Sequence, residues 1–232
     1  MFPFFFDRTM ILLIPAVILG FYAQMRIKNT YAQYSRFRSQ SGWTGAQIAR
    51  RMLDASGLRD VEIEQIGGKL TDHYDPKKRV LRLSEGVYGS DSVAALGVAA
   101  HETGHALQHG QEYLPLRVRS HFVPLASFGS GLAWPLFFIG FFFSASGLSF
   151  LMDLGIVFFA AAVLFHVVTL PVEINASRRA LALLGGPGYL TEEETKAAGK
   201  VLRAAAWMYV AAATMAIMQL IRMVMLRGGR DD

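Results

Sequence analysis

The chain has 232 residues, a formal net charge of +5 and 53% hydrophobic residues, and its mean hydropathy is positive. A chain this apolar is not an ordinary soluble domain, and its length excludes several large domains. The basic residues flank apolar segments, as membrane topology requires, so the charge does not indicate nucleic-acid binding. The absence of cysteine excludes disulfides and thiolate metal sites, so any metal must be held by histidine and carboxylate groups.

The first apolar segment, residues 10–22, is uncharged and mostly aliphatic. A cleaved signal peptide is the alternative, but no A-x-A site follows, so we expect an uncleaved transmembrane anchor within residues 1–25. Residues 10–22 are slightly short for a hydrocarbon core of about 30 Å, so we expect the phenylalanines within positions 2–6 to lie in the membrane interface. Four basic residues follow the segment: Arg26, Lys28, Arg36 and Arg38. By the positive-inside rule, this end of the span faces the cytoplasm.

Residues 26–121 are more polar and predict a small α+β domain. A capping box at residues 44–47 opens an amphipathic helix. Alternating apolar and polar residues predict short strands over 61–66, 70–74 and 79–83, arranged as an antiparallel meander. The last strand either covers the helix that follows or offers a free edge to an extended peptide by β-augmentation.

The H-E-x-x-H pattern of residues 101–105 carries the clearest chemistry. We expect Ser90 to cap its helix. His101 and His105 lie one turn apart on one helix face, so both imidazoles can point at one zinc ion. Glu102 can then reach the attacking water as general base, which suits peptide hydrolysis. A chance match is disfavoured, because an Ala- and Val-rich helix would bury these polar groups at a cost of roughly several kcal/mol.

A second polar cluster, residues 72–75, has two interpretations. In one, His73 or Tyr74 lies near the metal and donates a hydrogen bond to the tetrahedral oxyanion. In the other, Asp75 begins a turn, and His and Tyr occupy a half-buried strand. The residues alone favour the second without excluding the first.

Two long uncharged segments predict a transmembrane hairpin within residues 122–171. We expect spans over residues 123–143 and 150–170, separated by small residues at 144–147. His166 either approaches the metal or, as we favour, bonds a neighbouring helix. Because a hairpin returns the chain to the side it left, the next segment faces the same compartment as the H-E-x-x-H helix.

That next segment, residues 172–190, predicts a helix ended by a glycine-rich stretch. Glu173 lies near its start, and small residues share its face: Ala176, Ser177 and Ala180. A face with little bulk lets another helix approach closely, which favours Glu173 as the third zinc ligand. The alternative is a solvated Glu173 that pairs with Ser177 or Arg179.

His109 is the other candidate for the third ligand. On an ideal helix it is rotated about 80° from His101 and lies about 12 Å further along the axis. An ion held by His101 and His105 is therefore out of its reach, and we expect His109 to hydrogen-bond or face solvent.

Residues 191–232 predict a helix that begins with a capping box and runs into an apolar stretch, 204–226, long enough to span. Arg222 is expected to snorkel. If the N-terminus is outside the cell, four spans also place the C-terminus outside, together with Arg227 and Arg230. The positive-inside rule would instead place these two arginines in the cytoplasm, and the sequence leaves this conflict open.

These motifs together resemble the YugP-type neutral zinc metallopeptidases, a family of bacterial membrane proteins. The residues that carry the resemblance lie at 71–76, 83–85, 99–109 and 173–180, and the similarity extends over nearly the whole chain. It implies a zincin-like domain with His101 and His105 as ligands, Glu102 as base and Glu173 as the third ligand of a gluzincin. In related membrane gluzincins an Asp often stands at the position of Ser177, so the role of this serine beside the metal is left open.

The sequence therefore predicts a mainly α membrane protein with about four transmembrane helices and a small α+β zincin-like domain. We expect a zinc endopeptidase of the bacterial inner membrane whose active site faces the cytoplasm. One alternative is a scaffold or partner-binding membrane protein with a structural or inactive zinc site, and another is a zinc hydrolase of non-peptide substrates. The expected partners are a peptide or protein substrate, membrane proteins included, and the lipid bilayer; the oligomeric state is left open.

Overall fold

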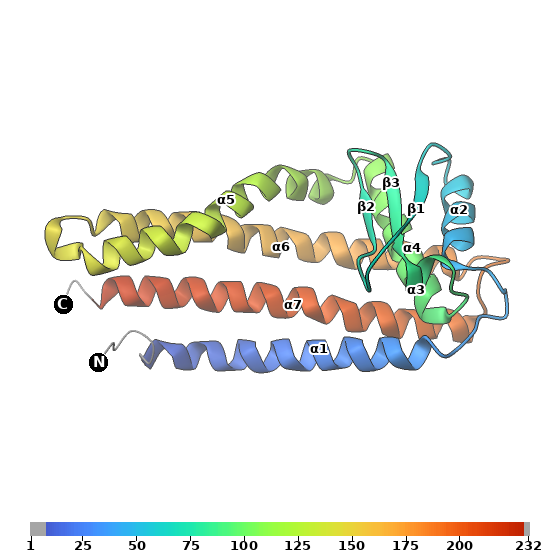
Figure 1. Ribbon diagram of the computed structural model, residues 1–232, viewed down its shortest axis with the longest axis horizontal. Helices are drawn as coiled ribbons and strands as arrows, with labels where there is room; N and C mark the ends of the chain where they lie inside the picture. The colour runs from blue at the N-terminus through green and yellow to red at the C-terminus, as the bar shows by residue number, and fades with distance from the viewer. Residues whose placement is uncertain (1–7, 230–232) are drawn as a thin grey trace. The chain divides into compact units, whose positions relative to one another are not determined.

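The computed structural model describes residues 8–229 and is mainly helical with one small sheet. This confirms the predicted fold class, while the phenylalanines at 2–6 and Arg230 lie outside the described residues. Figure 1 shows the elements in chain order. The helices are α1 (Ile14–Tyr34), α2 (Gly45–Ala55), α3 (Glu85–Tyr88), α4 (Val93–Gly110), α5 (Leu114–Phe142), α6 (Phe150–Leu184) and α7 (Glu192–Gly228). The strands are β1 (Glu62–Ile66), β2 (His73–Asp75) and β3 (Val80–Ser84), and two 3-10 helices are η2 (Arg8–Leu13) and η3 (Ser144–Ser146).

Within residues 8–229, four helical segments are long and apolar enough to cross a membrane. They are Arg8–Tyr34, Leu114–Phe142, Phe150–Leu184 and Glu192–Gly228. Their number confirms the prediction of about four spans. The chain divides into two compact units: one holds residues 8–22, 118–170 and 208–229, and the other holds residues 23–117 and 171–207.

The first unit contains the predicted hairpin, whose two helices pack through glycines. A Cβ added at Gly140 would lie 2.5 Å from the backbone nitrogen of Met152, and one at Gly155 would lie 2.6 Å from the carbonyl oxygen of Ala133. Such spacing leaves room for hydrogen only, so the two backbones approach as closely as helices can. The turn includes η3 and then Gly147 in the left-handed conformation, as the small residues predict.

Two arginines of α7 are held within the first unit rather than extended to solvent. Arg222 is 6% exposed, and its Nε donates to Thr9 Oγ1 at 3.2 Å, close to the start of the first span. A polar partner on a neighbouring helix thus binds the guanidinium, and its snorkelling to the membrane interface stays a prediction. Arg227 Nε donates to Asp153 Oδ1 at 2.9 Å. One of the two arginines that conflicted with the positive-inside rule is thus paired with a carboxylate.

The sheet of the second unit has the strand order β1-β3-β2, with β1 parallel and β2 antiparallel to β3. The predicted antiparallel meander is therefore wrong. The turn at Asp75 forms as predicted, since Asp75 Oδ1 accepts from the backbone nitrogens of Lys77 and Lys78. The segment between β1 and β2 is instead a loop with positive φ at Gly68 and Leu70, which carries the chain to the far side of β3. The most apolar strand, β3, thereby takes the buried centre.

Helix α4 lies at the core of the second unit, beside α2 and the sheet (Figure 1). The capping box of α2 forms as predicted: Thr44 Oγ1 accepts from the Gln47 nitrogen, and the Gln47 side chain accepts from the Thr44 nitrogen. The cap of α4 is Ser92 and not Ser90. The reason is that Ser92 pairs with Arg38 in an isolated β-bridge, which keeps the chain extended up to that residue.

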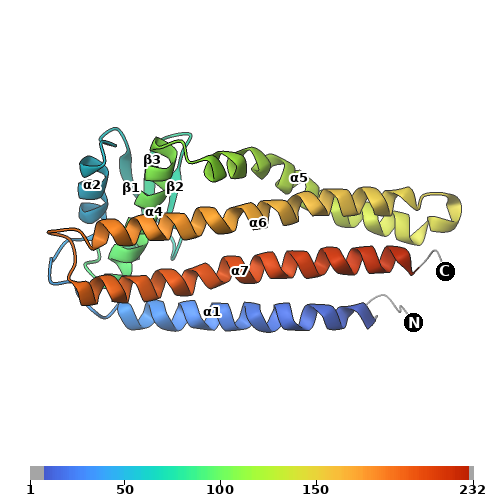
Figure 2. The same ribbon diagram turned by 180° about the vertical axis from the view of Figure 1, so that it is seen from behind.

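Helix α6 is continuous from Phe150 to Leu184, as its ribbon in Figure 2 shows. The segment predicted as a separate helix from residue 172 is thus the final part of α6. It ends at Leu184, where the glycine-rich stretch was predicted to stop it. The helix that contains the third apolar segment therefore also carries Glu173.

Candidate metal centre

Helices α4 and α6 bring together His101, His105 and Glu173, whose potential ligand atoms all lie within 4.8 Å of one another. Glu173 Oε2 is 3.2 Å from His101 Nε2 and 3.4 Å from His105 Nε2. The imidazole rings stand edge to face, with their centroids 4.8 Å apart. Among the described residues, neither His109 nor His166 belongs to this group, and the ring of His166 packs edge-on against Phe165.

The approach of α4 to α6 depends on small residues, as the sequence predicts. A Cβ added at Gly104 would lie only 2.5 Å from the carbonyl oxygen of Ala176. Ala176 and Ala180 are fully buried. Gly104 lies between the two histidines in the sequence, so this close contact with α6 falls within the H-E-x-x-H segment.

The amide of Gln108 determines which nitrogen of His105 faces Glu173. Gln108 Nε2 donates to the Val172 carbonyl oxygen at 2.8 Å and to Asn175 Oδ1 at 3.0 Å. Because a carbonyl oxygen can only accept, the amide orientation is fixed, and Gln108 Oε1 must face His105 Nδ1 at 3.0 Å as an acceptor. His105 Nδ1 therefore carries a proton, and in the neutral ring Nε2 presents a lone pair to Glu173.

This arrangement of lone pairs fits a bound cation. Glu173 is 3% exposed, so its carboxylate is largely removed from water. An unprotonated imidazole nitrogen and a carboxylate oxygen are both acceptors, and at 3.4 Å they repel unless a proton or a cation lies between them. Two nitrogens and one carboxylate oxygen are a donor set that zinc uses in catalytic sites, with the fourth position left for water.

Ser177 lies one turn after Glu173 on α6, and its Oγ is 3.0 Å from His101 Nδ1. The hydroxyl can accept from an Nδ1 proton, which leaves His101 Nε2 free to face Glu173. A serine at this position fixes the ring as a carboxylate would, but it brings no negative charge.

Glu102 is half-buried on α4 and has no hydrogen-bond or ion-pair partner among residues 8–229. It is rotated by about 100° from His101 on the helix. Its carboxylate is therefore not occupied by another protein group and is able to accept a proton.

The candidates on β2 point to opposite faces of the sheet, as strand alternation requires. Tyr74 faces α4, where its hydroxyl is 2.8 Å from His109 Nδ1. Burial raises the pKa of Tyr74 and lowers the pKa of His109, so both groups are neutral near pH 7. His73 is exposed, with Nδ1 2.8 Å from the Thr71 carbonyl oxygen and Nε2 3.4 Å from Arg82 Nη1. Tyr74 is thus the candidate that the structure directs toward α4, and His109 hydrogen-bonds as expected.

Four residues of this region were given no role from the sequence: Gln108, Gln111, Tyr113 and Asn175. Arg179 Nε donates to Asn175 Oδ1 at 2.7 Å, and the same guanidinium bonds Gln111 and lies over the Tyr113 ring. The alternative in which Arg179 pairs with Glu173 is therefore wrong. The signal for Gln108 was available, because it is an amide three residues after His105, one helical turn along the same face.

Comparisons with known proteins agree with this geometry. Residues 9–228 match the family model described as putative neutral zinc metallopeptidase. The chain is also 47% identical over 222 residues to the putative membrane protease YugP of Bacillus subtilis strain 168, which covers 95% of this chain and 97% of that protein. No solved structure matches the chain. The match over nearly the whole length places this chain in the family of putative neutral zinc metallopeptidases.

Proposed function

We propose that this protein is a membrane-anchored zinc endopeptidase in which His101, His105 and Glu173 hold the metal. The observation that carries the proposal is the group itself: two imidazole nitrogens and a buried carboxylate oxygen converge from α4 and α6. Among the described residues the group has three members, which matches a catalytic zinc site with one open position. A structural zinc site would be closed by a fourth protein ligand, so the alternative of a structural metal is less well supported.

The chain's own residues account for the proton transfers of peptide hydrolysis. A zinc ion held by His101, His105 and Glu173 would lower the pKa of a water molecule to about 7 and would polarise the scissile carbonyl. Glu102 accepts a proton from the attacking water while the water oxygen forms a bond to the carbonyl carbon. Glu102 then delivers this proton to the departing amine nitrogen as the C–N bond breaks. Tyr74, whose hydroxyl faces α4, is our candidate for a hydrogen-bond donor to the oxyanion.

We place the substrate along β2. The predicted free edge of the last strand does not exist, because β3 is the central strand. The edge strands of the sheet are β1 and β2, and β2 packs against α4. An extended peptide that adds to β2 by main-chain hydrogen bonds would therefore lie next to the helix that carries Glu102. This mode favours a peptide over a non-peptide substrate.

We further propose that the site faces the cytoplasm of a bacterial cell. The basic residues that follow the first span support this orientation.

The proposal is tested by measuring the zinc content of the purified full-length chain and its cleavage of unfolded casein. We expect about one zinc ion per chain, loss of cleavage after removal of zinc by 1,10-phenanthroline, and recovery on adding zinc. Bound zinc without cleavage of any peptide would support a structural site. Cleavage that survives complete removal of the metal would contradict the mechanism.

A further inference from the structure

Glu173, the proposed carboxylate ligand, is the first charged residue after a long uncharged stretch of α6. Residues 154–172 contain no Asp, Glu, Lys or Arg. At 1.5 Å per residue, this helical stretch is about 28 Å long. The hydrocarbon core of a bilayer is about 30 Å thick, so the stretch has no length to spare. A helix that crosses the core with these residues therefore places Glu173 at the boundary between hydrocarbon and headgroups.

The packing of α6 on α7 gives a second measure of this depth, within residues 171–207. A Cβ added at Gly199 of α7 would lie 3.5 Å from Leu181 Cδ1 of α6, and one at Gly185 would lie 3.6 Å from Thr195 Cγ2. From the second contact to the first, the chain position falls by four on α6 and rises by four on α7. The two helices are therefore antiparallel and advance in step.

This register places Glu173 beside Trp207 in depth. Glu173 lies eight residues before Leu181, and Trp207 lies eight residues after Gly199. At 1.5 Å per residue, each is about 12 Å from the contact between Leu181 and Gly199, in the same direction. Glu173 and Trp207 are thus at about the same level.

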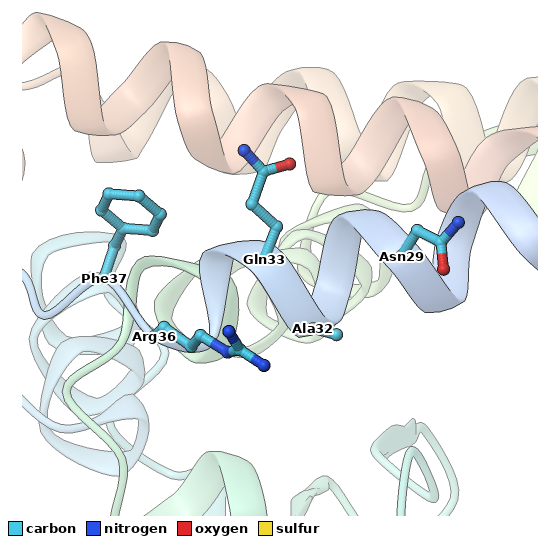
Figure 3. A pocket seen from close by; sticks show the side chains of 5 residues that line it. All are labelled: Asn29, Ala32, Gln33, Arg36 and Phe37. Carbon is cyan, nitrogen blue, oxygen red and sulfur yellow. The ribbon is translucent and has the colours of Figure 1, made fainter.

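Trp207 has the surroundings of a residue at the membrane interface. It is 37% exposed, and the guanidinium carbon of Arg26 lies 5.9 Å from its ring centroid. Tryptophan is enriched where hydrocarbon meets headgroups, and Arg26 is the first charged residue after the apolar segment of α1. Beyond Arg26, α1 carries Asn29, Gln33 and Arg36, which line a pocket on its surface with Gln33 and Arg36 pointing apart (Figure 3). The change from apolar to polar residues marks the same boundary that α6 marks at Glu173.

We infer that the substrate is a membrane-bound polypeptide, which is cut in the headgroup layer where it leaves the bilayer. The inference rests on the proposed function, because it takes Glu173 as a ligand of the catalytic metal. The headgroup layer extends roughly 5–7 Å beyond the hydrocarbon core, so a metal bound by Glu173 lies inside it. An extended chain advances about 3.3 Å per residue, so even a slanted path leaves this layer within about five residues. The scissile bond therefore lies within about five residues of the end of a transmembrane segment.

A site in the water above the membrane is the competing explanation, because an unfolded segment reaches such a site at any distance from the bilayer. Anchoring alone also speeds cleavage, since it confines enzyme and substrate to one membrane. Two anchored substrates that differ only in the distance of the segment from the membrane separate these explanations.

The experiment uses the full-length chain in liposomes with two substrates. Each is a transmembrane helix fused to the same casein segment of about ten residues, chosen because the protein cuts it in solution; one carries the segment directly after the helix, and the other holds it about 30 Å away on a helical spacer of EAAAK repeats. We expect the adjacent segment to be cut at least about tenfold faster, because a stiff spacer lowers the effective concentration of the segment at the site. Mass spectrometry should place the cuts within about five residues of the transmembrane helix. Glu102→Gln should slow both reactions equally.

Equal rates for the two substrates, or faster cleavage of the spaced one, would overturn the inference and leave the peptidase assignment intact. Cleavage of free casein without cleavage of the adjacent segment would overturn it too. If a zinc-loaded protein cleaved neither casein nor either anchored substrate, the proposed function would fail, and the inference with it.

The depth of the site can be measured in the same liposomes without a substrate, because the chain has no cysteine and can be spin-labelled at one introduced position. Ile174→Cys places the label next to Glu173, at a side chain that is 40% exposed. Leu164→Cys lies about 15 Å deeper along α6, and Glu193→Cys lies about 21 Å before Trp207 on α7, on the water side. We expect collisions of the Ile174 label with oxygen and with a water-soluble nickel chelate to lie between those of the two controls. Nickel access equal to that of the Glu193 label, or oxygen access equal to that of the Leu164 label, would contradict a site in the headgroup layer.

Discussion

Glu173 is buried with its carboxylate facing two imidazole nitrogens, and no comparable position is available to His109. The Nδ1 atom of His109 is bonded to Tyr74 instead. Glu173→Ala removes one of three ligands, so zinc affinity should fall by more than the roughly 10–100-fold that loss of an outer partner costs, and activity should be abolished. His109→Ala should largely retain both. Metal analysis of the two purified variants checks this, and the reverse order would refute Glu173 as a ligand.

Gln108 offers a second test at the residue scale, because it holds the His105 ring through Nδ1 without facing the metal group. Gln108→Leu keeps the side-chain volume similar but leaves His105 Nδ1 without an acceptor. We expect zinc affinity to fall by about 10–100-fold. Gln108→Glu, whose carboxylate can still accept from Nδ1, should recover part of the affinity. Zinc titration against a chromophoric chelator measures this, and equal affinities in all three proteins would show that Gln108 has no such role.

Helices α4 and α6 are in close contact at Gly104, where an added methyl group would clash with the backbone of α6. Gly104→Ala places Cβ 2.5 Å from the Ala176 carbonyl oxygen, and backbone atoms cannot turn aside as a flexible side chain can. We expect destabilisation of about 1–3 kcal/mol and weaker zinc binding, since the same contact sets the distance between ligands on α4 and α6. Thermal unfolding in detergent and zinc titration measure the two effects.

Gly97→Ala is the matched control, because it adds the same methyl group to the same helix. Its Cβ would lie 3.4 Å from the Ala198 Cβ, an ordinary van der Waals contact. Greater helix propensity should leave this variant as stable as the wild type or more so, by up to about 1 kcal/mol. If both variants were equally destabilised, close approach at Gly104 would not be the cause.

Features of these helices and strands could be predicted from the sequence when the contacts that determine them lie close together in the chain. The capping boxes, the end of α6 and the spacing of His101 and His105 are set within one or two helical turns, so they could be predicted. Alternation of residues is the same in parallel and antiparallel strands, so the position of β3 at the centre could not. The bonds from Gln108 to Val172 and Asn175 join distant parts of the chain and leave no local pattern.

At the scale of the whole molecule, the ligands on α4 and α6 must lie on the same side of the membrane. Reporter fusions near Arg38 and in the loop at residues 185–188 should therefore both report the cytoplasm, while a fusion at Ser146 should not. Paired alkaline phosphatase and fluorescent protein fusions give this readout. Opposite answers for the first two sites would exclude a metal shared by the two helices.

The most direct test of the central claim is to compare the wild type with Glu102→Gln, assaying zinc content and proteolysis of the same purified full-length samples. The substitution keeps the shape of the side chain and touches no proposed ligand, but the amide cannot accept the proton of the attacking water. We predict unchanged zinc content and thermal midpoint, with a rate of casein cleavage lower by about 10²–10⁴-fold. Wild-type turnover by a Glu102→Gln protein that retains its zinc would contradict the peptidase mechanism.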